Sequence, residues 1–483
     1  MQGWLHRQFP IMPMGEFALA SQLQRENWSV KLVNFGLEKK LDASYDVDRS
    51  IRSIESRIYA IDMHWAVHSS GAVKLANLCK KYHPESLVVL GGFTATWFHE
   101  RILAKYGSVD AVVLGEAEDA FSQLVRRTVH TRDLEGVPGV AYRSGGRIRR
   151  NQMAKPRENL DELDYANLRI LDNWRSYLQI EESGCDQNMR PYFWLNLARG
   201  CCYNCLHCGG GRDAYQALTG RQNMAFRSPA RVAEDIERLC QLGVRQISFS
   251  HDPEIAVKKY QTQLLDEIRR RRVDISVYYE SFRVPSRTFL ESINRLSFDT
   301  TVAISPDSPS DEVRIAAGRA FTNAQMMNAI EDCEDIGIKA DIYYMVGLPG
   351  ETIGFLRMFT NVLEKISCNI WTCVFPPIPY TIDPNCPMAT HPEKYGVKLF
   401  RETFDDYEAA MSSGFGLGRP MDWLLSIGHE TASLSKEEIC ELTLQANERT
   451  MRVPLSPMRR DLLEFSPVST RFGQERVREA SDS

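Results

Sequence analysis

Residues 192–211, YFWLNLARGCCYNCLHCGGG, join a short apolar run to a loop with four cysteines within eight residues. The run 192–198 is typical of a buried strand that ends at the glycine before the first cysteine. Cys201, Cys205 and Cys208 then follow with a Cys-x3-Cys-x2-Cys spacing. Three thiolates on one loop can bind three irons of a [4Fe-4S] cluster and leave the fourth iron open to a non-protein ligand. We therefore expect these cysteines to be the metal ligands and the catalytic centre.

A zinc site is the alternative, because Cys202 and Cys205 also form a Cys-x2-Cys pair and His207 lies nearby. A closed zinc site normally takes further ligands from a second loop. The next cysteine, Cys240, lies on the apolar face of a predicted helix, which indicates a core position. The spacing thus favours the cluster and leaves Cys202 as a thiol that is not a ligand.

Five more apolar runs follow the cysteine loop, separated by predicted helices. Ser228 and Gly243 delimit one helix, while Thr322 and Gln325 form a capping box for another that ends at Gly337. Six βα repeats predict a partial (βα)6 TIM-like barrel, with an open doubly wound sheet as the alternative. In barrel enzymes the site lies at the carboxyl ends of the strands, where the cysteine loop is expected. The six predicted strands are YFWLNLA, RQISFS, ISVYYES, DTTVAIS, KADIYYMVG and NIWTCVF.

Residues 15–127 also alternate strands with amphipathic helices, which predicts a doubly wound, Rossmann-like sheet. The candidate strands are VKLVNF, RIYAID, SLVVLGG and VDAVVLGE. Such sheets usually have five strands, and the first one is missing here. The runs VPGVAYR and GRIRRN, joined by Ser144-Gly145-Gly146, predict a β-hairpin, which a polar linker follows.

The chain therefore divides into five expected regions, an α/β architecture throughout its folded part. They are a Rossmann-like domain (1–135), a hairpin and linker (136–185), the barrel (186–396), a helical C-terminal region (397–465) and a disordered tail (466–483).

Composition limits the possible partners. Lys and Arg number 58 against 63 Asp and Glu, so no excess positive charge is available to neutralise nucleic acid. No apolar run approaches the ~20 residues of a membrane span, and the first residues lack the pattern of a secretory signal. We expect a cytoplasmic protein, in which clustered cysteines serve as metal ligands rather than disulfides.

The cysteine spacing at the end of a first barrel strand resembles the radical S-adenosylmethionine (SAM) superfamily. The resemblance implies that the open iron binds the amino and carboxylate groups of SAM and that the reduced cluster cleaves SAM to a 5′-deoxyadenosyl radical. Two departures are present: His207 replaces the aromatic residue before the last cysteine, and Ser250-His251-Asp252 replaces a glycine-glycine-glutamate motif. The SAM contacts that the resemblance implies are His207, Gly209, Gly210, Ser250, Asp252, Ser305, Asp307 and Gly347.

The loops 91–96 and 115–118 follow predicted parallel strands, the position where doubly wound folds bind cofactors. Together with the hairpin and the cysteine loop, this order resembles the cobalamin-binding radical SAM enzymes. Asp62-Met63-His64 partly matches a cobalt-ligating Asp-x-His-x-x-Gly motif, but Val67 replaces its glycine, so cobalamin is expected without a histidine lower ligand. The implied cobalamin contacts are Met63, His64, Gly91, Gly92, Thr94, Gly115 and Glu116.

Within this family, the segments IDMHWAVHSSGA and IDPNCPMATHPEKYG resemble C-methyltransferases of natural-product pathways, including the pyrrole methyltransferases of aminocoumarin antibiotic biosynthesis. The resemblance implies methylation of a carbon on a small molecule, with an external flavodoxin- or ferredoxin-type electron donor. The alternatives are a rearrangement, cyclisation or ring contraction with the same cofactors, or an iron-sulfur sensor or electron-transfer protein. Tyr380, Asp383 and His391, on a loop after the sixth strand, either face a substrate or anchor the C-terminal region.

Overall fold

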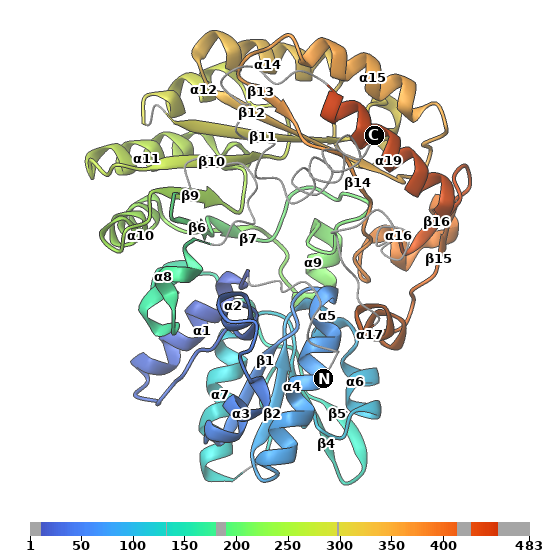
Figure 1. Ribbon diagram of the computed structural model, residues 1–483. Helices are drawn as coiled ribbons and strands as arrows, with labels where there is room; N and C mark the ends of the chain where they lie inside the picture. The colour runs from blue at the N-terminus through green and yellow to red at the C-terminus, as the bar shows by residue number, and fades with distance from the viewer. Residues whose placement is uncertain (1–10, 132, 180–189, 297–298, 413–426, 453–483) are drawn as a thin grey trace, which may run out of the picture.

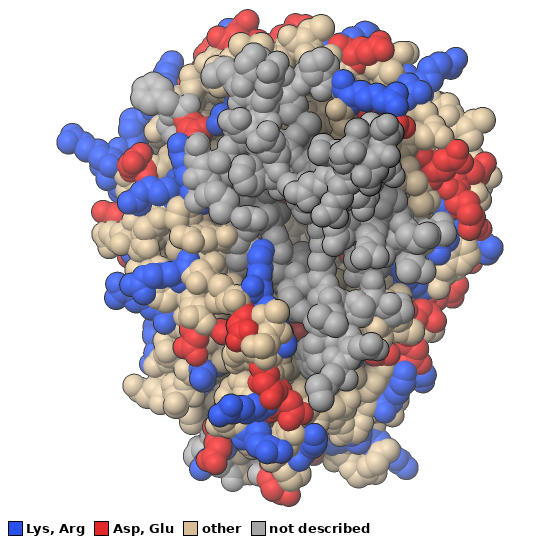
Figure 2. Space-filling model, viewed as in Figure 1, with Lys and Arg blue, Asp and Glu red and all other residues tan. Residues whose placement is uncertain are grey.

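The computed structural model describes residues 11–131, 133–179, 190–296, 299–412 and 427–452. Two α/β halves are stacked along the long direction of the molecule: an N-terminal sheet and a larger, curled sheet (Figure 1). None of the helices within these ranges combines the length and the hydropathy that crossing a membrane requires. On the face in Figure 2, described charges of both signs are interspersed rather than gathered into a patch of one sign.

The N-terminal sheet has the strand order β1-β2-β3-β4-β5. Its parallel strands are β1 (Ile58–Asp62), β2 (Leu87–Gly91) and β3 (Ala111–Val113). Side chains of α4 (Ser69–Tyr82) and α6 (His99–Lys105) pack in the core on one face, and those of α1 (Met14–Arg25) and α7 (Glu118–His130) on the other. The doubly wound arrangement expected from the sequence is confirmed.

The predicted hairpin consists of β4 (Val140–Ser144) and β5 (Arg147–Arg150) and extends this sheet. Strand β4 pairs with β3 antiparallel, because its buried Val140, Ala141 and Tyr142 continue the apolar surface of β3. The N-terminal sheet therefore continues beyond residue 135.

The strand predicted for 30–35 is wrong. Leu32 forms only an isolated bridge to Leu171, and α2 (Phe35–Leu41) begins immediately afterwards. The physical reason is local: the Asn34 side chain accepts a hydrogen bond from the Leu37 N–H at 3.0 Å and so starts a helix.

The second sheet is an open parallel barrel with the order β6-β9-β10-β11-β12-β13, and β14 (Ile378–Pro379) also pairs with β12. All six predicted strands are present. They are β6 (Tyr192–Leu195), β9 (Gln246–Phe249), β10 (Ser276–Ser281), β11 (Thr300–Asp307), β12 (Lys339–Val346) and β13 (Thr372–Val374). The helices lie along the outer face of the sheet (Figure 1): α10 (Pro229–Gln241), α11 (Lys258–Arg270), α12 (Arg287–Asn294), α14 (Asn323–Ile336) and α15 (Phe355–Ile366).

Two helices that the sequence delimits begin as expected. Ser228 caps α10, and the capping box of Thr322 and Gln325 is formed at α14, which ends at Gly337 in the left-handed conformation. The short strands β7 (Ala198–Arg199) and β8 (Ala225–Phe226) pair with each other as an antiparallel ribbon. In the sequence, β7 precedes and β8 follows the segment that contains the cysteine loop and α9 (Arg212–Thr219).

The C-terminal region contains α17 (Phe404–Ser412) and α19 (Lys436–Arg452), together with a small antiparallel sheet of β15 (Val397–Leu399) and β16 (His429–Thr431) that was not expected. The tail 466–483 lies outside the described residues. Helix α17 packs on the N-terminal half through Phe404 and Tyr407, which lie in the same core as α4.

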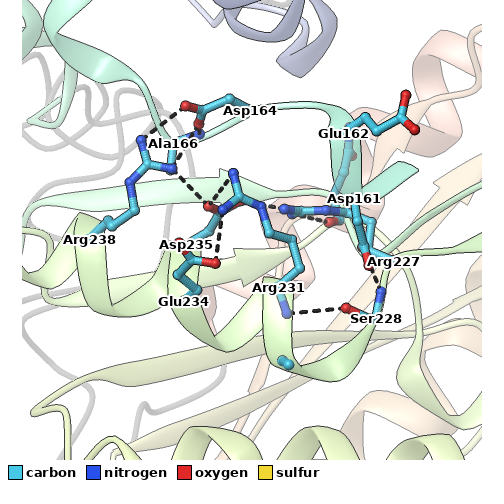
Figure 3. Close-up of polar contacts among 12 residues, drawn as sticks. Asp161, Glu162, Asp164, Ala166, Arg227, Ser228, Arg231, Glu234, Asp235 and Arg238 are labelled. Carbon is cyan, nitrogen blue, oxygen red and sulfur yellow. Dashed lines mark hydrogen bonds and ion pairs between the residues drawn. The ribbon is translucent and has the colours of Figure 1, made fainter. Parts of the chain in front are cut away.

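Ion pairs attach the linker to the barrel (Figure 3). Arg238 of α10 holds Asp164 at 3.0 Å through both guanidinium nitrogens, and the Asp161 carboxylate accepts the Ser228 N–H at 2.8 Å. Arg227 and Asp235 form a fully buried pair beneath them. The linker is therefore fixed to the first helix of the barrel.

Candidate cofactor site

The cysteine loop leaves the ribbon strand β7 at the carboxyl end of β6 and runs to α9. Cys205 is buried, Cys201 and Cys208 are partly buried, and Cys202 is exposed. The Cys201 thiol hydrogen-bonds to Cys202, which lowers the pKa of Cys202 to about 7. Burial raises the pKa of Cys208 to about 11. Metal binding must therefore supply the stabilisation that deprotonates the buried thiols.

A second loop, which follows β14, binds the backbone of the cysteine loop through two hydrogen bonds. The Gly209 N–H donates to Asp383 at 2.8 Å, and Asn385 Nδ2 donates to the Gly209 carbonyl at 2.7 Å. A side chain is excluded at Gly209, since a Cβ atom there would lie 2.2 Å from Asn385 Oδ1. Asp383 thus anchors the cysteine loop, a role that differs from both alternatives that the sequence leaves open for it.

His207, on the cysteine loop, contacts Tyr380, which directly follows β14. Its Nδ1 lies within hydrogen-bond distance of the Tyr380 hydroxyl, and the two rings meet edge to face with centroids 4.5 Å apart. Burial lowers the pKa of His207 to about 4, so its imidazole is neutral. The Nδ1 edge of the His207 ring is bound to Tyr380, so only the opposite edge of the ring is available for a cofactor contact.

On the inner side, Gly318 approaches the cysteine loop: a Cβ atom there would lie 3.0 Å from the Cys205 Cα. The next residue, Arg319, donates from Nε to Asp307 at 3.0 Å and lies near enough to Cys205 to interact electrostatically. Sequence analysis did not single out Gly318 and Arg319, because neither belongs to a motif.

The segment Ser250-His251-Asp252 after β9, which contains two of the expected SAM contacts, forms hydrogen bonds within the protein. Ser250 Oγ donates to Asn196 at 2.6 Å and lies 3.0 Å from Nδ1 of His251. The two Asp252 oxygens accept the N–H groups of Glu254 and Phe282, each at 2.8 Å. Asp252 is thus a structural anchor of the rim, and each of its carboxylate oxygens already accepts one backbone hydrogen bond.

At the end of β12, the Gly347 N–H donates to the buried carboxylate of Glu351 at 2.8 Å, and the Gly347 carbonyl lies 2.7 Å from Nε2 of His429. Both backbone groups of Gly347 are therefore occupied. Ser305 and Asp307 both lie in β11, at its carboxyl end, and Asp307 has a positive φ of 63°.

The expected cobalamin contacts lie at or just after the carboxyl ends of the three parallel strands β1, β2 and β3. The Met63 side chain is fully buried in the core, so it is a packing residue and not a cofactor contact. The His64 ring lies 4.4 Å from that of Phe93, and burial lowers its pKa to about 4. Thr94 donates from Oγ1 to the His64 carbonyl at 3.0 Å and so ties the two loops together.

The three glycines among the expected cobalamin contacts differ in the space that surrounds them. Gly92 has a φ of +102°, and a Cβ atom there would lie 2.5 Å from the His64 Cα. By contrast, a Cβ atom on Gly91 would meet nothing within 4 Å. Gly115 faces the second half of the molecule, where its Cβ would lie 3.2 Å from the Leu218 carbonyl oxygen.

Glu116 and Glu118 form a buried ionic network with the barrel half. Arg221 binds Glu116 through two hydrogen bonds of 2.6 and 2.8 Å, and Arg199 binds Glu116 at 3.2 Å and Glu118 at 2.9 Å. Tyr215 donates to Glu116 at 3.2 Å. The carboxylate of Glu116, an expected cobalamin contact, is thus used between the halves. Arg199 and Arg221 carry no recognisable motif, and only the folded chain identifies them.

Breaking this network should destabilise the junction of the two halves. We expect Arg221→Met to cost about 3–5 kcal/mol, because it leaves the buried Glu116 without its bidentate partner. Arg212→Met, which removes an exposed pair with Asp213, is the control and should leave the stability close to that of the wild type. Urea unfolding and hydrogen exchange of residues 111–118 measure the difference, and equal effects would contradict the role of the network.

The residues fit the expected groups in their chemistry. Within the described residues, no three His, Cys, Asp or Glu side chains converge on one point, and this includes the three cysteines of the loop. The three thiols occupy one loop held from outside, and Cys201 would have to turn from Cys202 to join Cys205 and Cys208. At the ends of β1 and β2, a Cβ atom on Gly91 would enter open space, and the aromatic rings of His64 and Phe93 lie 4.4 Å apart, which is compatible with the close approach of a large flat cofactor.

Comparison with known proteins agrees with this architecture. The Radical SAM superfamily matches residues 195–360, and the B12 binding domain matches residues 5–125. An uncharacterized methyltransferase of Pyrococcus horikoshii is 27% identical over 347 residues, covering 70% of each chain. The anaerobic magnesium-protoporphyrin IX monomethyl ester cyclase of Rubrivivax gelatinosus is 25% identical over 293 residues, covering 58% of this chain and 49% of the cyclase.

Among solved structures, the radical SAM methyltransferase TsrM of Kitasatospora setae, with cobalamin and a [4Fe-4S] cluster bound, has a TM-score of 0.66. It is 14% identical, and the match covers 93% of this chain and 88% of TsrM. This similarity shows a shared fold.

The curled parallel sheet with its cysteine loop defines a radical SAM enzyme, and the doubly wound domain defines a B12-binding protein. The chain therefore belongs to the cobalamin-dependent radical SAM enzymes, and its relatives support the methyltransferases as its group. Its cofactors are a [4Fe-4S] cluster, SAM and cobalamin.

Proposed function

We propose that this enzyme methylates a carbon atom of a small-molecule natural product in the cytoplasm, taking electrons from an external flavodoxin- or ferredoxin-type donor. When bound, the cluster with SAM supplies a hydrogen-abstracting radical and cobalamin supplies a carrier for the methyl group. We propose Cys201, Cys205 and Cys208 as the cluster ligands and Gly91 and His64 as cobalamin neighbours.

One observation carries this proposal. Arg199 lies two residues before Cys201 and binds Glu116 and Glu118, which follow the third strand of the B12 binding domain. The network is almost fully buried, so the rim of each half is held against the other. Rigid juxtaposition supports joint action of the two cofactor sites on one substrate, since reacting groups must be held in a narrow geometry.

The chain's own share of the work is positioning and exclusion of water. Asp383 and Asn385 fix the backbone of the cysteine loop, and Gly318 lets the fourth barrel loop approach it closely. The neutral rings of His64 and His207 add no charge to the interior of the site.

Product analysis tests the methyltransferase proposal. Incubation of the reduced protein with SAM and extracts of candidate substrates should give S-adenosylhomocysteine and 5′-deoxyadenosine in comparable amounts, because methyl donation and radical formation need different SAM molecules. Label from the SAM methyl group should appear on a carbon of the product. Labelled product without 5′-deoxyadenosine would contradict the radical route.

The similarity to the magnesium-protoporphyrin cyclase supports a second candidate, a cyclisation or rearrangement with the same cofactors. In that case we expect 5′-deoxyadenosine and a chemically altered substrate that carries no label from the SAM methyl group. Absence of both by-products under strong reductant would instead support an iron-sulfur sensor or electron-transfer protein.

A further inference from the structure

Glu280 is a carboxylate inside the partial barrel to which neither the cysteine loop nor the recognised motifs assign a role. Its neighbour Tyr279 packs against Phe289 of α12, on the helix side of the sheet. Alternation along β10 therefore turns Glu280 to the interior face, as it does Tyr278, whose hydroxyl lies 2.8 Å from that of Tyr343 on β12. Glu280 lies at the carboxyl end of β10, on the rim that carries the cysteine loop.

The Glu280 carboxylate makes no hydrogen bond or ion pair with any described residue. The nearest cation, Arg319, interacts with it electrostatically but is committed to Asp307 at 3.0 Å and to the Phe282 carbonyl at 3.4 Å. Burial raises the pKa of Glu280 to about 7. Glu280 is partly buried, and a carboxylate withdrawn from water without a hydrogen-bond partner costs stability, which points to a ligand that completes it.

The neighbours of Glu280 on the interior face of the sheet are small or polar. Its register partner on β11 is Ala303, and Asp341 follows on β12, so a small side chain separates two interior acidic positions. One layer below, Ser248 is 1% exposed, and its hydroxyl has no hydrogen-bond partner. The interior face is thus polar, with hydrogen-bonding capacity that the protein itself does not use.

On the neighbouring rim, the segment that replaces the glycine-glycine-glutamate motif is bound within the protein. Ser250 and His251 lie within hydrogen-bond distance of each other, and both oxygens of Asp252 accept backbone N–H groups. Glu280, by contrast, accepts no hydrogen bond from any described residue.

We propose that Glu280 is the binding site for an ammonium group, carried either by the amino acid part of SAM or by an amine on the substrate. A charged hydrogen bond inside the barrel would pair the carboxylate and orient its ligand towards the rim. The proposal rests on the radical SAM assignment and not on methyl transfer, so its outcome is independent of the outcome of the methylation test.

Binding measurements on the anaerobically purified, cluster-loaded protein test this site. If Glu280 binds SAM, Glu280→Gln should raise the Kd for SAM roughly 10- to 100-fold, as expected for loss of a charged hydrogen bond. The Kd for methylthioadenosine, which lacks the amino group, should not change. If Glu280 binds the substrate, the Kd for SAM stays constant, and butylammonium, unlike butanol, raises the melting temperature of the SAM-loaded wild type but not of Glu280→Gln.

The isosteric substitution preserves packing, and iron content and circular dichroism verify that each variant is folded and loaded. Glu254→Gln is the matched control, because Glu254 is a nearby, partly buried carboxylate that already binds Ser286 at 2.7 and 3.0 Å. It should leave both readouts unchanged. Unchanged SAM affinity together with no discrimination between butylammonium and butanol overturns the proposal.

Discussion

Replacing any one of Cys201, Cys205 and Cys208 by Ala should abolish reductive SAM cleavage and lower the bound iron and sulfide. Each thiolate is the sole protein ligand of one iron in a three-cysteine site, so its loss leaves that iron bound only by the cluster. Anaerobic reconstitution followed by iron and sulfide analysis and 5′-deoxyadenosine quantification measures the effect. The fold should survive, because the loop is also held by Asp383 and Asn385.

Cys202→Ala is the internal control for this series. Cys202 is exposed and lies on the same loop, beside Cys201. Its removal frees the Cys201 thiol from that hydrogen bond and should leave iron content and SAM cleavage near the wild-type values. Full loss of iron in Cys202→Ala with retention in Cys205→Ala would refute the ligand assignment.

Gly92→Val should largely abolish cobalamin uptake while leaving the cluster loaded. A side chain at this position would meet the backbone of His64 at 2.5 Å, and its φ of +102° is unfavourable for any residue with a Cβ atom. The conformational strain alone costs about 1–2 kcal/mol, and the clash forces the loop of His64 to move. Optical spectra of the protein after incubation with hydroxocobalamin, together with its iron content, measure both sites.

Gly91→Ala separates steric damage from cofactor contact. Its added methyl group would enter open space, so the unliganded protein should remain as stable as the wild type. If cobalamin approaches this strand end closely, Gly91→Ala nevertheless weakens uptake. Normal uptake by both Gly91→Ala and Gly92→Val would exclude the proposed cobalamin position.

Much of the architecture could be predicted from the chain alone, because it depends on local patterns. The six barrel strands have apolar, β-branched runs of ordinary length, and helices α10 and α14 have strong start and stop residues. The segment 30–35 also has a strand-like composition, yet Asn34 caps a helix there. Composition favoured a strand, but the cap and the lack of a described neighbouring strand decided otherwise.

The candidate site, too, could be predicted only in part from the sequence. The cysteine spacing identifies the cluster loop without any structure, since three ligands within eight residues must be neighbours in space. Local sequence could not foresee that Glu116 binds Arg199 and Arg221, that Asp252 binds backbone N–H groups, or that Met63 is a core residue.

The sequence by itself thus determined the order of the two α/β halves and the loop that carries the three proposed cluster ligands. Only the tertiary structure decided which polar side chains on the rim that carries this loop are already bound within the protein and which, like Glu280, have no hydrogen-bond partner among the described residues. The physical reason is that hydrogen bonds and ion pairs join residues far apart in the chain. Arg221 and Glu116, for example, are 105 positions apart and become partners only when the two halves pack together.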